Sequence, residues 1–176
     1  MPTYISKAFS EFLEENVRLD KTTGNLFWKK QSWKGIRNMN KPIGSTQSKN
    51  YLSFRVMFDG KSRLLLNHRV VFFLAQGYWP NVIDHIDGNG KNNHPDNLRD
   101  CSQAQNVGNS KSSRGSTSVY KGVYWNTEKR KWAAQMTQGK KSIKLGYFTC
   151  EKEAALAYNY KAKEYFGDFA RFNQVF

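Results

Sequence analysis

Four polar residues late in the first two thirds of the chain could together carry out phosphodiester hydrolysis. Asp84 and His85 stand side by side after a short apolar run, Asn97 follows in a turn-rich segment, and Asn106 comes last. Carboxylate and amide oxygens are the hard ligands that Mg²⁺ takes in proteins, where it keeps several waters and binds phosphate oxygens. A neutral imidazole beside such an ion can accept a proton from water. These are the parts that a one-metal phosphodiester hydrolase requires.

Local sequence signals place these residues on a strand, a long loop and a short helix. Asp84 and His85 end an apolar run, which predicts a strand. Ser102 followed by Gln105 is a capping-box pattern, which predicts that a helix begins there and carries Asn106. Because successive strand residues face opposite sides of a sheet, the Asp-His pair can share one site only if the strand ends or bulges there.

Asn97 is suited to hold the histidine in place. Its side chain could hydrogen-bond the second ring nitrogen of His85 and so fix the tautomer. The stretch could instead be an ordinary surface turn, because it is rich in Asp, Asn, Gly and Pro. The stretch does not match a calcium-binding loop. Neither Asp84 nor Asp87 begins the series of alternating oxygen ligands and closing Glu that such a loop needs. The joint presence of Asp-His, Asn-Leu-Arg and a capped Asn favours the hydrolase over the turn.

The stretch DHIDGNGKNNHPDNLRDCSQAQN resembles the HNH nucleases, most closely the phage and intron-encoded homing endonucleases. The resemblance implies a ββα-metal motif that holds one Mg²⁺, for which Mn²⁺ can substitute. It makes Asp84 the first metal ligand, His85 the general base, Asn97 the middle residue and Asn106 the second ligand. Asn106 departs from the histidine of the family name, but several phage members share this H-N-N form.

The charge of the chain indicates a polyanionic partner. Its 176 residues include 28 Lys and Arg against 14 Asp and Glu, a net charge of +14. Each phosphate that a basic side chain neutralises releases counterions, which favours binding to nucleic acid. Residues 111–176 hold 13 basic and 5 acidic side chains, hence +8, so positive charge is densest there. A merely soluble basic protein is the plain alternative.

Cysteine usage and hydropathy exclude several other classes of protein. Cys101 and Cys150 are too few and too far apart for a disulfide scaffold or a zinc site, which suggests reduced thiols in an intracellular protein. No apolar run approaches membrane-spanning length, and no secretory signal opens the chain. We therefore expect an intracellular protein without a membrane partner or a small-molecule substrate, in the bacterial host's cytoplasm if a phage encodes it.

Local patterns before the Asp-His pair predict elements that pack around the motif. They predict a helix over 5–16, two short strands within 17–28, a hairpin over 52–66 and a helix over 68–76. Ser6 and Asn67 can cap the two helices. Residues 29–50 are polar and basic, so we expect loop or irregular strand there, lying along DNA. A His-Arg pair like His68-Arg69 recurs close to the motif in the resembling nucleases. The alternative is a partly buried His68 with Arg69 on a DNA phosphate, and neither residue is expected to be catalytic.

The last third of the chain predicts a separate module. Residues 110–118, SKSSRGSTS, are small and polar without periodicity, which is typical of a linker. Alternation then predicts strands over 120–125, 131–137 and 142–148, followed by a helix from a Thr149 cap to about Phe166. Side chains expected to face that helix are Trp132, Ala134, Met136, Ile143 and Leu145. Those expected to face away are Ala133, Gln135, Thr137, Ser142 and Lys144.

This module resembles the ethylene-response-factor DNA-binding domain of plants, which some phage endonucleases also carry. The matching landmarks, in order, are YKGV, KWAA, LGYF, EAALAY and a closing FN. The resemblance implies that the open face of a three-stranded sheet meets the major groove. The residues that would face DNA are Lys121, Tyr124, Asn126, Gln135, Thr137, Ser142 and Lys144. Most positions where plant members use Arg or Trp differ here, so phosphate contact is a safer expectation than base reading.

The sequence thus predicts an α+β protein with a ββα-metal nuclease domain over 1–109, a linker over 110–118 and a DNA-binding domain over 119–176. The predicted activity is Mg²⁺-dependent cleavage of duplex DNA by a homing-type endonuclease, acting as a monomer or a dimer. One alternative is a non-enzymatic DNA-binding regulator whose nuclease motif has decayed. A weaker one is an RNA-binding protein.

Overall fold

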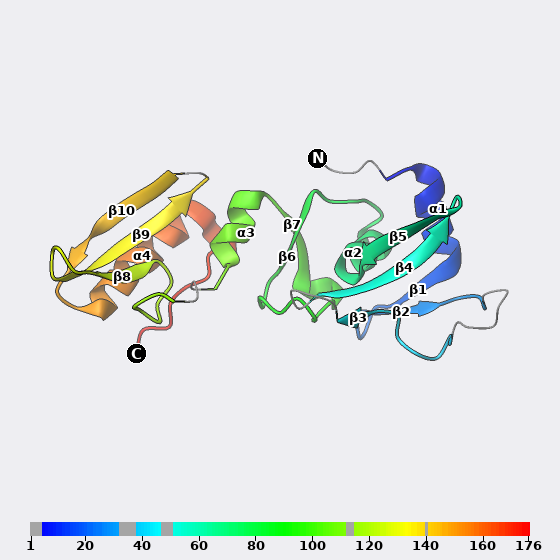
Figure 1. The fold of residues 1–176 in the computed structure, drawn as a ribbon, viewed down its shortest axis with the longest axis horizontal. Helices are drawn as coiled ribbons and strands as arrows, with labels where there is room; N and C mark the ends of the chain where they lie inside the picture. Colours follow the sequence, from blue (N-terminus) through cyan, green and yellow to red (C-terminus); the bar gives the residue numbers. More distant parts are fainter. Residues whose placement is uncertain (1–4, 32–37, 47–50, 112–114, 140) are drawn as a thin grey trace. The chain divides into compact units, whose positions relative to one another are not determined.

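The computed structural model describes residues 5–31, 38–46, 51–111, 115–139 and 141–176. Helices are mixed with small sheets in which all neighbouring strands run antiparallel, which confirms the predicted α+β class (Figure 1). The chain packs as two compact units, residues 1–101 and residues 102–176. In the described residues, no helix has both the length and the apolar character needed to cross a bilayer.

The first unit alternates helices with short hairpins. Its elements are α1 (Lys7–Asn16), β1 (Val17–Asp20), β2 (Asn25–Trp28), β3 (Ser45–Thr46), β4 (Leu52–Phe58), β5 (Lys61–Leu66), α2 (Asn67–Gln76), β6 (Val82–His85), the 3₁₀ turn η2 (Pro95–Asn97) and β7 (Leu98–Cys101). The sheets are β1-β2, β3-β4-β5 and β6-β7. Of the predicted loop over 29–50, residues 32–37 and 47–50 lie outside the described residues.

Helix α2 lies at the centre of this unit's core. It contacts β1, β2, β4, β5, β7 and η2, and its Val70 and Val71 are fully buried. The helix begins at Asn67 itself, and Leu66 precedes it without a side-chain cap, so the predicted Asn67 cap is wrong. The Asn67 amide instead donates to the Ile43 carbonyl at 2.7 Å. That long-range hydrogen bond takes the side chain that would otherwise cap the helix. Ser6, by contrast, caps α1 as predicted.

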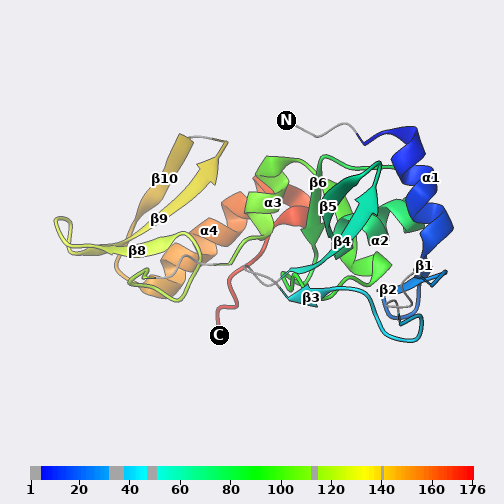
Figure 2. The ribbon, with the colours of Figure 1, turned by 45° about the vertical axis from the view of Figure 1, so that its right-hand side comes forward.

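The second unit is a three-stranded sheet with helices. It comprises α3 (Gln103–Asn109), β8 (Val123–Asn126), β9 (Lys131–Gln138), β10 (Lys141–Phe148), α4 (Glu151–Phe166) and the 3₁₀ turn η3 (Gly167–Phe169). Strand β9 is central, and α4 lies along one face of the sheet (Figures 1 and 2). Small side chains at Ala154, Ala155 and Ala162 let α4 approach the strands closely. The α4 cap is Cys150, one residue after the predicted Thr149.

The sheet departs from the simple alternating pattern in one register and in one burial. The pairing of β10 with β9 shifts register between Lys144 and Gly146, a bulge that the sequence prediction lacked. Ala133 lies on the face away from α4, as alternation predicts, but it is only 3 % exposed. Its cross-strand partners are Tyr124 and Tyr147, and partners share a face, so the two rings shield this small side chain from solvent.

The predicted linker belongs in part to the second unit. The Trp125 amide donates to Thr117 Oγ1 at 2.8 Å, and Ser118 Oγ donates to Glu151 at 2.7 Å. Residues 112–114 lie outside the described part of the chain. Helix α3 also groups with the second unit, ahead of the predicted linker. The domain limits drawn from the sequence stay a prediction, with these contacts favouring an earlier boundary.

Candidate active site

Asp84 and His85 are the last two residues of β6, directly before the loop of the β6–β7 hairpin. In the antiparallel register Asp84 lies opposite Arg99, and His85 lies opposite Leu98. Both the aspartate and the histidine are buried, with 4 % and 6 % of their surface exposed. Strand β6 ends at His85, and the Gly88 amide donates to the His85 carbonyl in the turn that follows. The strand therefore ends where the sequence required it to end.

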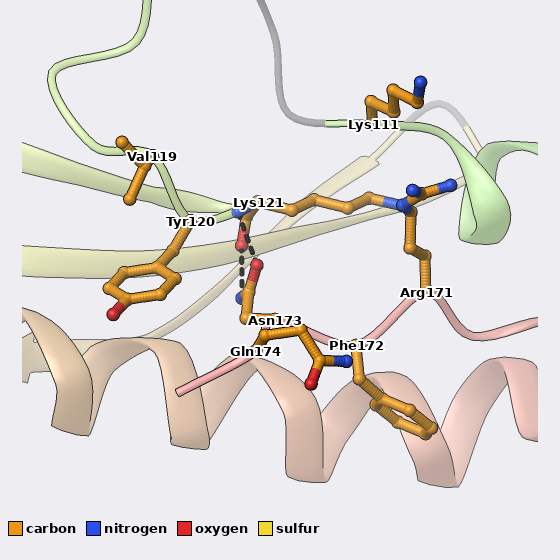
Figure 3. A pocket seen from close by; sticks show the side chains of 8 residues that line it. All are labelled: Lys111, Val119, Tyr120, Lys121, Arg171, Phe172, Asn173 and Gln174. Carbon is orange, nitrogen blue, oxygen red and sulfur yellow. Dashed lines mark hydrogen bonds between the residues drawn. The ribbon is translucent and has the colours of Figure 1, made fainter. Parts of the chain in front are cut away.

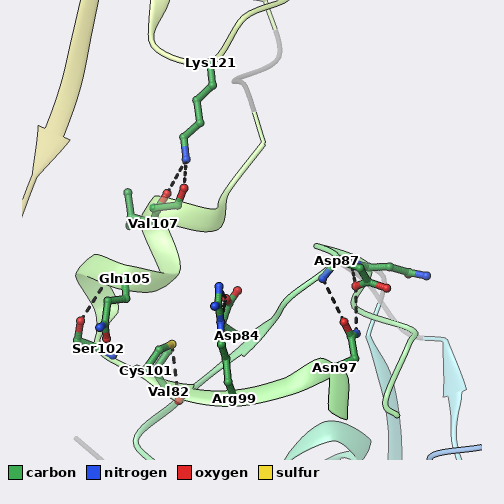
Figure 4. Close-up of polar contacts among 12 residues, drawn as sticks. Val82, Asp84, Asp87, Asn97, Arg99, Cys101, Ser102, Gln105, Val107 and Lys121 are labelled. Atoms are coloured by element: carbon green, nitrogen blue, oxygen red, sulfur yellow. Dashed lines mark hydrogen bonds and ion pairs between the residues drawn. The ribbon is translucent and has the colours of Figure 1, made fainter. Parts of the chain in front are cut away.

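An arginine on the facing strand holds the aspartate. The Asp84 Oδ2 atom accepts from Arg99 Nε at 2.9 Å and lies 2.8 Å from Arg99 Nη2 (Figure 4). Charge-assisted hydrogen bonds of this kind are short and strong, and this one joins a buried carboxylate to a partly buried arginine. The pair fixes the direction of the carboxylate. Sequence reasoning noted the Asn-Leu-Arg motif but not this role, which follows from the hairpin register.

The histidine sits in a cluster of rings. His85 Nε2 lies 3.2 Å from Asn93 Oδ1. The rings of His68 and Tyr51 lie with centroids 5.1 Å and 5.7 Å from the His85 ring. An amide oxygen can only accept, so this contact selects the tautomer with a proton on Nε2 and leaves Nδ1 as the basic nitrogen.

The neighbouring His68 is a neutral residue of the same cluster. Burial, assisted by His85 and Arg69, lowers the pKa of His68 from its ordinary value of 6.5 to about 3. Its Nδ1 atom is buried without a hydrogen-bond partner among the described residues. A second imidazole, uncharged at neutral pH, therefore packs against the His85 ring.

Asn97 contacts the loop rather than the histidine. Its Nδ2 donates to Asp87 Oδ1 at 3.0 Å and to the Asn92 carbonyl at 2.8 Å, while its Oδ1 accepts from the Asp87 amide at 3.1 Å. The hydrogen bond to the His85 ring that we predicted for Asn97 is made by Asn93. Asn97 thus shapes the loop that delivers Asn93, and its place in catalysis stays a prediction.

The Asp87 carboxylate accepts hydrogen bonds from several residues of that loop. It accepts from the Asn89 amide at 2.7 Å and from Asn92 Nδ2 at 2.8 Å, in addition to Asn97. Burial raises the pKa of Asp87, but these hydrogen bonds outweigh burial and leave the pKa below its ordinary value. An ionised Asp87 therefore keeps the loop closed across neutral pH.

Asn106 lies on α3, as the capping box predicted. Ser102 Oγ accepts from the Gln105 amide at 3.2 Å, and Gln105 Oε1 accepts from the Ser102 amide at 2.8 Å (Figure 4). Asn106 follows directly, and its amide donates to the Ser102 carbonyl. The helix groups with the second unit, whereas Asp84 and His85 group with the first.

The predicted metal ligands fit a hard, hydrated cation. Asp84 offers a carboxylate and Asn106 an amide oxygen, the donor types that Mg²⁺ takes while keeping waters and binding phosphate. Across the described ranges, no group of three or more His, Cys, Asp and Glu side chains could hold a metal ion.

The residues predicted to face DNA divide into two groups. Six share the sheet face opposite α4, where Gln135 pairs with Lys144 and Thr137 with Ser142; the other two of the six are Tyr124 and Asn126. Lys121 and Arg69 instead use their cationic groups within the protein. Arg69 donates to the carbonyls of Pro80 and Asn81, and Lys121 Nζ donates to the carbonyls of Val107 and Gly108.

Comparison with known proteins defines the class. Residues 66–107, which run from the end of β5 through the hairpin into α3, match the family model described as HNH endonuclease. The chain belongs to the HNH endonuclease family and is a DNA endonuclease. HNH nucleases generally use a divalent metal ion.

Two viral proteins are similar over much of the chain. Protein 3.8 of Escherichia phage T7 is 35 % identical over 101 residues, which cover 56 % of this chain and 78 % of that protein. An uncharacterized HNH endonuclease, L560, of Acanthamoeba polyphaga mimivirus is 31 % identical over 126 residues, covering 69 % of this chain and 63 % of that protein.

One solved structure was also similar. It is the HNH homing endonuclease I-HmuI, in a structure of DNA binding and cleavage, with 27 % identity and a TM-score of 0.41. The match covers 52 % of this chain and 49 % of that chain, so it spans about half of each. The resemblance of the second unit to the plant DNA-binding domain stays a prediction.

Proposed function

We propose that this chain is a homing-type endonuclease that needs Mg²⁺ and is positioned on duplex DNA by the sheet of its second unit. One observation carries the proposal. Asp84 and His85 lie buried at the end of β6, and each is held by its own side-chain partner, Arg99 and Asn93. A decayed motif would not need to retain both partners. The phage relative supports an origin in a phage, and hence action in a bacterial cytoplasm.

In the proposed reaction His85 acts as the general base. Its Nδ1 removes a proton from a water molecule. Its Nε2–H remains hydrogen-bonded to Asn93 Oδ1 and keeps the ring oriented. The resulting hydroxide attacks the scissile phosphorus, and the P–O3′ bond breaks. Asp84 and Asn106 would hold Mg²⁺, or Mn²⁺ in its place, which when bound stabilises the charge on the phosphorus centre and on the departing 3′ oxygen.

Arg99 and His68 support this chemistry without taking part in proton transfer. Arg99 aims the Asp84 carboxylate through two contacts below 3 Å. His68 packs edge-on to the His85 ring and remains neutral because its pKa is about 3. The Asp84 carboxylate is therefore held in one direction, and the His68 ring beside His85 does not change its charge over the neutral pH range.

The second unit is proposed to bind the DNA. Its sheet face away from α4 carries Gln135, Thr137, Ser142 and Lys144 in two cross-strand pairs. Lys144 is exposed and suited to phosphate, and Gln135 is suited to a base edge.

Cleavage of supercoiled plasmid with Mg²⁺ tests the proposal. The His85→Ala variant should lose on the order of 10²–10⁴ in rate while DNA affinity stays close to that of the wild type. His94→Ala is the matched control, since His94 lies in the loop that follows His85 and its ring contacts Asp96. Cleavage by His85→Ala at the wild-type rate, or no Mg²⁺-dependent cleavage by the wild type, would overturn the proposal.

A further inference from the structure

The C-terminal end of α3 is held by other parts of the second unit. Lys121 Nζ donates to the Val107 carbonyl at 2.9 Å and to the Gly108 carbonyl at 2.5 Å (Figure 4). The Arg171 amide also donates to the Gly108 carbonyl, at 3.1 Å. The last carbonyls of a helix lack partners inside the helix and carry partial negative charge. Ser110 supplies a local cap, since its amide and its Oγ donate to the Val107 carbonyl at 3.1 and 2.8 Å. Lys121 adds a charged donor from outside the helix to the same carbonyl and to that of Gly108.

Lys121 is itself fixed at its backbone. Its amide donates to Asn173 Oδ1 at 2.7 Å, and its carbonyl accepts from Asn173 Nδ2 at 3.1 Å, beside the hollow of about 400 Å³ shown in Figure 3. Asn173 in turn exchanges two hydrogen bonds with Asn159 of α4, at 2.7 and 2.8 Å. A continuous series of hydrogen bonds therefore links α4, the C-terminal segment, Lys121 and the end of α3.

Close packing against Phe166 and Phe169 also restricts the position of the last turn of α3. A Cβ atom placed on Gly108 would lie 2.7 Å from the Phe166 ring and 3.1 Å from the Phe169 carbonyl oxygen. Phe166 is 5 % exposed and belongs to the core beneath α4. Only glycine allows this approach, so the last turn of α3 is fixed by contact as well as by hydrogen bonds.

We propose that Lys121 is a positioning residue of the nuclease site, through which the second unit sets the position of Asn106. The inference rests on the proposed function, in which Asn106 is a metal ligand. Asn106 directly precedes Val107, whose carbonyl Lys121 holds, so a shift of the last turn shifts Asn106 with it. This role replaces the phosphate contact predicted for Lys121, because two of the three ammonium donors are directed at helix carbonyls.

The test compares Lys121→Met with Lys161→Met. Lys161 pairs with Glu164 on the surface of α4, so its loss removes the same charge without touching α3. Single-turnover cleavage at saturating DNA is measured over a Mg²⁺ series, and DNA affinity over a salt series without Mg²⁺. Lys121→Met should lose about 10–100-fold in apparent Mg²⁺ affinity or maximal rate, as is typical when a residue that orients a metal ligand is removed. Its salt slope should match that of Lys161→Met.

Two further variants keep the test decisive. Lys121→Arg should restore part of the Mg²⁺ affinity, because guanidinium can still donate to the carbonyls. Gly108→Ala should shift the Mg²⁺ dependence in the same direction without any change of charge, and circular dichroism melting shows whether each variant is folded. If folded Lys121→Met and folded Gly108→Ala both keep the wild-type Mg²⁺ dependence, the inference is overturned. A salt slope lowered by about one in Lys121→Met, with unchanged Mg²⁺ dependence, would restore the phosphate role instead.

Asn106→Ala separates this inference from the proposed function. If Asn106→Ala loses Mg²⁺-dependent cleavage and Lys121→Met does not, only the positioning role fails. If Asn106→Ala keeps the wild-type Mg²⁺ dependence, the ligand assignment fails, and the positioning role fails with it. In the double variant, Lys121→Met should add little to the loss from Asn106→Ala, because both changes act through one ligand.

Discussion

Burial of His68 makes the stability of the protein depend on pH in a way that one substitution can isolate. Its pKa falls from 6.5 to about 3 because the ring is buried, with His85 and Arg69 adding to the effect. The unfolded chain takes up a proton at this residue below its ordinary pKa, and the folded chain does not. The stabilising contribution is therefore complete above pH 6.5, and it is lost progressively as the pH falls from 6.5 toward 3.

The loss of folding free energy follows from the difference between the ordinary histidine pKa of 6.5, which applies to the unfolded chain, and the pH of the assay. At about pH 5 this difference is roughly 1.5 units, and at about 1.36 kcal/mol per unit the folded state loses about 2 kcal/mol relative to neutral pH. His68→Phe keeps a ring of similar size but removes the titration. Its free energy of unfolding should therefore fall by about 2 kcal/mol less than that of the wild type between neutral pH and about pH 5.

Urea denaturation at the two pH values measures this difference. All other titrating groups are common to both proteins, so the difference between the two losses reports His68 alone. His94→Phe is the control for the exchange of a histidine for phenylalanine, because His94 is partly exposed and lies in the loop of the β6–β7 hairpin. An equal loss of stability in wild type and His68→Phe would refute the argument that burial keeps His68 neutral.

Three further outcomes are expected. Arg99→Met should lower the free energy of unfolding by about 3–5 kcal/mol, since it leaves the buried Asp84 carboxylate without its paired charge; urea denaturation measures it. Asn93→Ala should lower the single-turnover cleavage rate at saturating DNA with little change in DNA affinity, because Asn93 orients His85 and is not placed on the DNA-binding face. Gln135→Ala should alter preference among duplex sequences with little change in salt slope, and binding across a salt series checks this.

The strand, loop and helix of the motif could be predicted because their signals are local. The Ser102 and Gln105 capping box and the apolar run before Asp84 depend only on residues a few positions apart. The partner of His85 could not be found in this way. Asn93 and Asn97 lie in one loop and have the same side chain, so only the path of the chain decides which one reaches the ring.

Longer-range contacts explain the other differences. Asn67 is an ordinary capping residue by type, but its amide meets the carbonyl of Ile43, far away in sequence. Lys121 has the residue type and position of a phosphate contact in the resembling domain, yet its ammonium group reaches helix carbonyls. In both cases the local pattern gave the chemical group, and tertiary structure decided what that group binds.

The short length of α3 makes its support by the second unit a physical necessity. It has seven residues, and isolated helices of that length are not stable in water. Its N-terminal end is closed by its own capping box; at its C-terminal end the Val107 carbonyl accepts from the amide and hydroxyl of Ser110, and Lys121 and the Arg171 amide add donors from farther along the chain. The match to the HNH family ends at residue 107, where these external contacts begin. The residues that follow the family motif thus help to hold the helix that carries Asn106, the metal ligand of the proposed function.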